Sequence, residues 1–311
     1  MKKTLASIVV LAFLGFGCHK ENHTTSEKVL RFKLKFDPDQ IRLDNLGNPS
    51  GELPANHAAQ TPDFHAMSAH FIELVPDEFT AYKAGAFVYK GEEVPADNPN
   101  PFNFTTAIDF EKAIVVDEGE VFLEVPISEV AAGTYRHIRV SVTYQNYDVK
   151  YNLLNLPVIG QLNQQNGTVA SFVGYNTYIE KLRIRDKEMD VSDFKLQGFW
   201  GFETNLNAPY SAYNQISSGQ APTNSTTVVN PFPNAPIPQG SCVVSGSFEQ
   251  PLVITGQEKE AIEITLSMSI NNSFEWEDLN GNGEWDIDAQ APATSEPVVD
   301  MGLRGLKALV D

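Results

Sequence analysis

The sequence predicts an all-β protein, an antiparallel β-sandwich of the immunoglobulin-like or jelly-roll-like kind with one long loop rich in proline and asparagine. Three observations predict this class. Apolar and polar residues alternate with a period of two over many short stretches, which is typical of strands buried on one face. Gly, Pro, Asn and Asp, which favour turns, separate these stretches. No stretch of comparable length carries an apolar stripe with the 3.6-residue period of a helix.

The first residues are predicted to be an export signal. Lys2 and Lys3 precede an almost wholly apolar run over 5–16, which is too short to span a bilayer as a helix. The run ends at Gly17 and Cys18 and resembles the lipobox of bacterial lipoproteins, in which the cysteine is acylated and becomes the first mature residue. We therefore expect residues 1–17 to be a lipoprotein signal peptide and Cys18 to be its lipidation site. An ordinary signal peptide cleaved elsewhere, or a short anchor, is the alternative.

Residues 18–28 are polar and lack aliphatic side chains, so we expect a flexible tether. The pair Lys20 and Glu21 resembles part of the surface-export signal of Bacteroidota lipoproteins. The expected location is therefore the outer membrane, with the lipid-anchored chain on the cell surface. An anchor that faces the periplasm is the alternative.

From residue 29 onward the alternation predicts a succession of strands. The clearest example runs over 262–276, and after Gln145 the apolar residues change parity, which predicts a β-bulge or a bend between sheets. The expected strands cover 30–36, 69–75, 86–90, 121–127, 138–151, 168–173, 178–184, 196–202, 243–248, 252–255 and 262–276.

Residues 29–311 are predicted to form one domain with a loop excursion at 205–239, where six prolines interrupt any regular pattern. A linker between two domains is less favoured, because the segment after residue 240 has too few strands to close its own sandwich. Cys242 lies in an apolar, strand-like context and is expected to be a buried core residue.

The charge balance excludes one class of partner. The chain has 22 Lys and Arg against 40 Asp and Glu, a net charge of -18 at pH 7. Such a surface repels phosphate backbones and anionic lipid headgroups. We expect no nucleic-acid binding.

The sharpest local motif lies between residues 278 and 288. Oxygen-bearing residues occupy loop positions 1, 3, 5 and 9, and glycine occupies position 6, where a calcium loop of the EF-hand type turns sharply. The motif resembles calcium loops of bacterial surface proteins, in which an acidic residue at position 12 closes the site. That position is Ala289, so Asp288, Glu275 or Glu277 would have to take its place. Hard oxygen ligands favour a structural Ca²⁺ over Zn²⁺, and a plain Asn-Gly hairpin is the alternative. The expected site residues are Asp278, Asn280, Asn282, Glu284 through its backbone carbonyl, Asp286 and Asp288.

A second candidate site is a group of histidines. His57, His65 and His70 fall within one short segment, and neutral imidazoles bind copper or zinc. Their spacing matches no metal motif, so three separate solvated or hydrogen-bonded histidines are the alternative.

Aromatic and acidic residues offer weaker indications. Flat faces for sugar rings could come from Trp200, Trp276 and Trp285 and from the loop tyrosines Tyr210 and Tyr213. Trp276 follows the apolar parity of its strand, which favours a core position instead. Glu275 and Glu277 share the polar face of that strand, where we expect them to be solvated. The sequence contains none of the common catalytic fingerprints.

Three segments add a resemblance to a family. Residues 133–144, and the stretches SFEWED (273–278) and VVDMGLRGL (298–306), resemble uncharacterised all-β surface lipoproteins of Bacteroidota. The resemblance implies a location and a fold but no chemical activity. We therefore expect a non-catalytic binding or accessory module whose partner is a glycan or an envelope protein. Capture of copper or zinc by the histidines and a polysaccharide-active enzyme are the alternatives.

Overall fold

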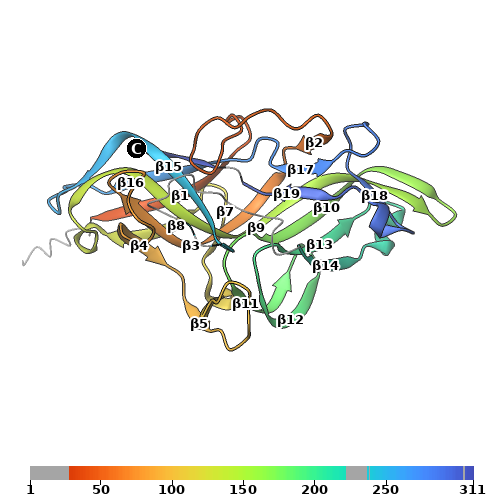
Figure 1. The fold of residues 1–311 in the computed structure, drawn as a ribbon, viewed down its shortest axis with the longest axis horizontal. Coiled ribbons are helices and arrows are strands. Elements are labelled where there is room, and N and C mark those ends of the chain that lie inside the picture. Colours follow the sequence, from red (N-terminus) through yellow and green to blue (C-terminus); the bar gives the residue numbers. More distant parts are fainter. Residues whose placement is uncertain (1–27, 222–236, 238, 304) are drawn as a thin grey trace, which may run out of the picture.

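The computed structural model describes residues 28–221, 237, 239–303 and 305–311, which form an all-β, sandwich-like fold (Figure 1). The predicted signal peptide, Cys18, the tether as far as residue 27, and residues 222–236 and 238 of the predicted long loop lie outside the described residues. In the part of the chain that is described, no helix is long and apolar enough to cross a membrane.

The described residues form twenty strands and four short 3-10 helices. The elements are β1 (Val29–Asp37), β2 (His57–Gln60), β3 (Asp63–Val75), β4 (Ala86–Lys90), β5 (Glu93–Pro95), β6 (Thr106–Asp109), η1 (Phe110–Lys112), β7 (Val115–Asp117), β8 (Val121–Pro126), η2 (Ile127–Glu129), β9 (Gly133–Leu156), β10 (Gly160–Phe172), β11 (Thr177–Arg183), β12 (Glu188–Lys195), β13 (Phe199–Asn205), η3 (Tyr210–Tyr213), β14 (Ile216–Gln220), β15 (Cys242–Ile254), β16 (Ile262–Ser269), β17 (Phe274–Glu277), β18 (Asp286–Asp288), η4 (Pro292–Thr294), β19 (Val298–Met301) and β20 (Leu306–Val310).

The strands form three sheets. The largest follows the order β14-β13-β10-β9-β15-β20-β16-β1-β8. Off this path, β3 and β18 pair with β9, and β4 and β7 pair with β3. The smaller sheets are β12-β11-β6-β5 and β19-β17-β2. The predicted all-β, sandwich-like fold is confirmed, but the expectation that its strands are antiparallel needs one correction. Four pairs of the described strands are parallel: β1 with β16, β15 with β20, β18 with β9, and β6 with β11. The alternation of apolar and polar residues indicates which face of a strand is buried. It does not depend on whether the neighbouring strand runs parallel or antiparallel, so the sequence could not distinguish the two.

The strands of the large sheet direct their alternating apolar side chains into a common core. In β1, Leu30, Phe32, Leu34 and Phe36 are each at most 2% exposed. These side chains and those of β3, β9, β15 and β16 belong to one apolar cluster that runs from Leu30 to Ala308. The strands of the large sheet therefore pack around this cluster in a sandwich-like arrangement. A smaller cluster lies between β9, β10, β11 and β13.

The change of parity predicted after Gln145 corresponds to a change of neighbours along β9. Residues up to Val142 pair with β15 on one edge, whereas residues from Tyr144 onward pair with β10 on that edge. Opposite this point, the register between β3 and β9 shifts three times between Phe64 and Phe71. Of the two predicted alternatives, a bulge or a bend between sheets, the register shifts confirm the bulge, and β9 pairs with both β15 and β10.

Two predicted boundaries need correction. The strand expected over 262–276 is divided into β16 and β17, because the chain turns between them and Asn272 adopts a φ of 48°. The first part of the predicted 205–239 loop is ordered: η3 is followed by β14, which pairs with β13. Cys242 is buried in the main cluster, and burial raises the pKa of its thiol to about 12, so it is a core residue as predicted.

Candidate functional site: the acidic loop at residues 278–296

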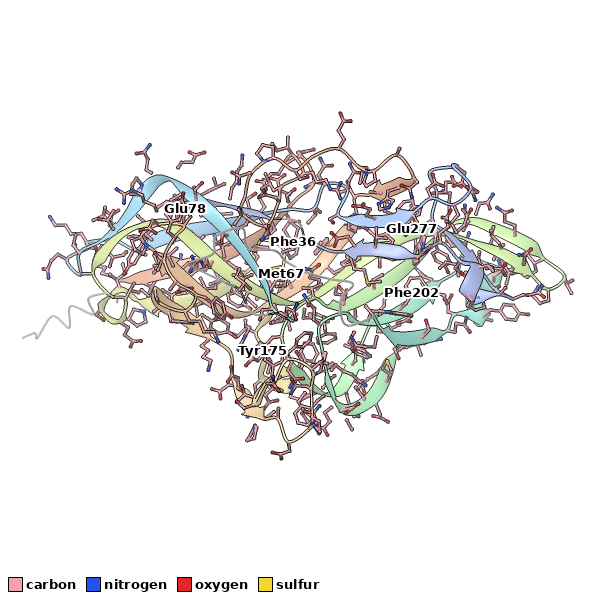
Figure 2. All side chains as sticks on the ribbon, in the orientation of Figure 1. Phe36, Met67, Glu78, Tyr175, Phe202 and Glu277 are labelled. Carbon is pink, nitrogen blue, oxygen red and sulfur yellow. The ribbon has the colours of Figure 1, made fainter. Side chains whose placement is uncertain are left out.

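The predicted calcium loop lies between β17 and β18, beside the longest hairpin of the molecule. β18 pairs in parallel with β9, so Asp286 lies opposite Asn152, close to the β9–β10 turn. Figure 2 labels Glu277, the residue before the loop, on the half of the molecule that carries this turn. We call residues 278–296 the acidic loop.

The Asp278 carboxylate organises the first half of the acidic loop. Its oxygens accept backbone N–H groups from Gly281 (2.8 Å), Asn282 (3.2 Å) and Gly283 (2.9 Å). Gly281 and Gly283 have φ values of 74° and 73°, which a side chain would make unfavourable. Both glycines of the motif are therefore required by the turn itself.

Four of the predicted ligand side chains come together. The amide groups of Asn280 and Asn282 both reach the same carboxylate oxygen, Oδ2 of Asp286, at 2.6 and 3.0 Å. Asn282 N–H in turn donates to Asn280 Oδ1 at 3.0 Å. Asp278, Asn280, Asn282 and Asp286 thus form one compact group of oxygen-bearing side chains.

Glu284 and Asp288 point to the β9–β10 hairpin instead. The Glu284 carboxylate accepts hydrogen bonds from Asn152 (2.7 Å) and Gln164 (2.8 Å). Asp288 accepts one from Asn155 (2.7 Å) and others from its own turn. The Asp288 side chain therefore makes its hydrogen bonds to the hairpin and to its own turn, and not to the group of four.

Sequence reasoning missed Glu296, which lies at the base of the loop. It is 5% exposed, and its carboxylate accepts the N–H groups of Leu279 (3.0 Å) and Asp286 (2.9 Å). Burial raises the pKa of Glu296, and the charges of Asp286 and Asp278 raise it further. Because Glu296 lies far beyond the twelve-residue loop motif, no local spacing could have identified it.

The donor set of the loop fits a hard cation. Carboxylate and amide oxygens are preferred by Ca²⁺, and Asp278, Asn280, Asn282, Asp286 and the Glu284 carbonyl could supply them. Among the described residues, neither the acidic loop nor any other region contains a group of three or more His, Cys, Asp or Glu side chains that could hold a metal ion. A calcium site in this loop would depend on asparagine and backbone oxygens as well as carboxylates.

The three histidines of the second candidate site are not brought together. His57 Nδ1 lies 2.6 Å from Glu275, His65 Nε2 lies 3.3 Å from Asp148, and His70 Nε2 lies 2.7 Å from Glu93. Burial lowers the pKa of His70, whereas hydrogen bonding to Asp148 raises the pKa of His65. Each imidazole has its own carboxylate, which is the arrangement of separate histidines that the sequence left open.

The prediction that Glu275 is solvated is wrong, because its side chain is buried. It is 6% exposed and contacts both Arg42 and His57, and it lies opposite Asp300 in the β17–β19 pair. Burial, and then the neighbouring Glu275 charge, raise the pKa of Asp300 to about 7. We call Arg42, His57, Glu275 and Asp300 the buried ionic cluster, in which Glu275 is buried and the other three residues are half-buried around it.

The aromatic candidates divide between core and surface. Trp276 and Trp285 belong to the main apolar cluster, and Trp285 Nε1 donates to the Glu296 carbonyl at 3.1 Å. Trp200 and Tyr210 are half-buried against that cluster, and Tyr213 is exposed. Among the tyrosines and tryptophans proposed as sugar platforms, Tyr213 presents the most open ring.

Comparison with known proteins finds no matching family model, no matching curated protein and no matching solved structure.

Proposed function

We propose that the chain is a lipid-anchored, non-catalytic binding module of the outer membrane or cell surface, with a structural calcium ion in the acidic loop. The observation that carries the proposal is the N-terminal pattern: two lysines, an apolar run over 5–16, and Cys18 after a small residue. Its resemblance to Bacteroidota lipoproteins supports the same location. The partner would be a glycan or another envelope protein.

Calcium would serve the architecture of the module. Asp278, Asn280, Asn282 and Asp286 would hold the ion with the Glu284 carbonyl, while the Glu284 and Asp288 carboxylates remain bonded to the β9–β10 hairpin. Ca²⁺ supplies a positive charge among carboxylates whose donors are all neutral. It would thereby fix the loop and stabilise the hairpin beside it.

The copper or zinc alternative has weaker support, because His57, His65 and His70 each lie against a different carboxylate. The polysaccharide-active alternative would need acidic residues on a surface open to substrate. Glu275 is instead enclosed with Arg42 and His57.

The anchor is tested in cells that produce the full chain or its Cys18→Ser variant and are fed a clickable palmitate analogue. We expect label on the chain and its recovery in the outer-membrane fraction, with both lost in Cys18→Ser. Protease added to intact cells then separates a surface location, where the chain is degraded, from a periplasm-facing one, where it is protected. Equal labelling of a Cys242→Ser control is required, and an unlabelled wild-type chain would overturn the anchor.

A further inference from the structure

The tip of the β9–β10 hairpin is an exposed apolar point. Leu156, Pro157, Val158 and Ile159 connect the two strands, and Val158 and Ile159 are both exposed. Figure 1 shows this hairpin projecting at one end of the longest axis, whereas β1 starts near the other end. A flat surface could therefore touch the tip before it touches the rest of the molecule.

The segment that forms the tip is free of charge. Between Lys150 and Glu180 the sequence contains no Asp, Glu, Lys, Arg or His, although the whole chain carries a net charge of -18. Asn155 precedes the apolar residues, and Gln161 and Asn163 follow them, as an uncharged, exposed collar. Such a tip can be withdrawn from water without desolvating an ion.

The backbone holds the tip in a fixed and unfavourable shape. Val158 has a φ of 69°, a left-handed conformation that is unusual for a β-branched residue. Asn155 beside it is tied to the acidic loop twice, through Asp288 (2.7 Å) and Gln290 (2.6 Å). The apolar residues are thus presented by a braced turn.

The size and charge of the tip indicate what it contacts. A stable protein interface takes about 20 to 30 residues from each partner, far more than this convex point offers. A bilayer accepts a few apolar side chains at its surface, and their contributions add to binding with no groove to match. An acidic chain without lysine or arginine at the tip gains nothing from anionic headgroups.

We propose that the β9–β10 tip inserts shallowly into an uncharged lipid surface through Leu156, Val158 and Ile159. This second membrane contact goes beyond the proposed lipid anchor and does not depend on it. Because the tip and the start of β1 lie at opposite ends, an anchored molecule would either lie along its own membrane or reach a second one.

The test uses the full chain with Cys18→Ser, which removes the acylation site and leaves the buried Cys242 as its thiol. A cysteine replaces the exposed Gln161 of the collar and carries an environment-sensitive dye; in a parallel sample it replaces the exposed Gln257, in the turn between β15 and β16. With vesicles of phosphatidylcholine, we expect the emission at 161 to shift to shorter wavelength and the emission at 257 to stay unchanged. Val158→Asp should lower vesicle binding by at least about tenfold, because an ion would then enter the interface.

The matched control is Val253→Asp, which places the same charge on another exposed apolar position and should leave the shift at 161 intact. An absent shift at 161, a shift that survives Val158→Asp, or one that needs phosphatidylglycerol would each overturn the proposal. A shift at 257 alone would show contact through the turn between β15 and β16 and would overturn it too. A missing acyl group in the palmitate experiment would remove the anchor and leave this result unaffected.

Discussion

Two groups of acidic residues lie close together in the last third of the chain, and they differ in the partners of their carboxylates. In the buried ionic cluster, Glu275 contacts the Arg42 guanidinium and the His57 ring. In the acidic loop, the hydrogen bonds that reach the carboxylates come from backbone amides and from asparagine, glutamine and threonine side chains. The five carboxylates are those of Asp278, Glu284, Asp286, Asp288 and Glu296.

The difference teaches which group should bind a cation. A carboxylate beside a guanidinium is already compensated, and an added metal ion would have to displace that partner. Neutral donors satisfy the hydrogen-bonding capacity of the loop carboxylates but leave their negative charges in place. The acidic loop therefore retains the electrostatic reason to take up Ca²⁺, and the buried ionic cluster does not.

The largest expected effect comes from breaking the buried ionic cluster. Arg42→Met removes the guanidinium from beside a nearly inaccessible Glu275, so the free energy of unfolding should fall by about 3 kcal/mol. Urea denaturation at pH 7 measures it. The double variant Arg42→Met, Glu275→Met should recover much of the loss, because the buried Glu275 charge is then removed together with the guanidinium that compensates it. A single variant as stable as the wild type would show that Arg42 does not compensate Glu275.

Calcium should act on the other group. At a free Ca²⁺ concentration about 100 times the dissociation constant, the free energy of unfolding should rise by about 2.7 kcal/mol, with a matching rise in melting temperature. Mg²⁺ should give less, because it demands tighter octahedral geometry and loses its water reluctantly. Thermal unfolding with Ca²⁺, Mg²⁺ and chelator makes the comparison.

Asp278→Ala should abolish the calcium response, and Asp278→Asn should weaken it while keeping an oxygen that accepts the glycine amides. Asp186→Ala, at an acidic side chain that is 84% exposed, is the matched control and should respond as the wild type does. An unchanged calcium response in Asp278→Ala would contradict the assignment of the ion to this loop.

The two groups also show which features of the structure can be predicted from local sequence patterns. The alternation in β1 and β16 correctly predicts their buried faces, and the parity change in β9 correctly predicts a bulge, because both are local patterns. The Asp278 turn was predictable too, since its glycines and carboxylate lie within six residues.

Long-range pairing is what the sequence could not supply. Glu275 occupies the polar face of its strand, but the side chains of Arg42 and His57 lie against its carboxylate, so it is buried. Glu296 joins the acidic loop from outside its motif. Parallel neighbours such as β1 and β16 are separated by more than two hundred residues and leave no trace in either strand's alternation.

Titration of Asp300 should make the stability that the buried ionic cluster contributes depend on pH. Its folded pKa of about 7 lies above the ordinary value of 3.8, so the folded protein binds a proton that the unfolded chain has released. The contribution to stability is present below pH 3.8, falls as the pH rises towards 7, and is lost above it. Asp300→Asn removes this loss and keeps an oxygen for the Met301 amide, so it should be more stable than the wild type at pH 8 by about 2 kcal/mol.

The measurement is urea denaturation of both proteins at several pH values between 4 and 8. The two stabilities should converge at the acidic end and separate as the pH rises. A constant difference across the range would mean that the Asp300 carboxyl does not titrate in this window.

The smallest expected effect separates two roles within the acidic loop. The Glu284 side chain bonds to Asn152 and Gln164, and only its backbone carbonyl is a predicted ligand, so Glu284→Gln should cost about 1 kcal/mol of stability or less and change calcium affinity little. Asp286 lies in the group of four, so Asp286→Asn should weaken calcium binding about tenfold or more by removing a charged ligand. Calorimetric titration of both variants with Ca²⁺ compares them. Equal losses of affinity would mean that total charge, and not the position of each carboxylate, determines binding; a larger loss in Glu284→Gln would place the ion against the hairpin.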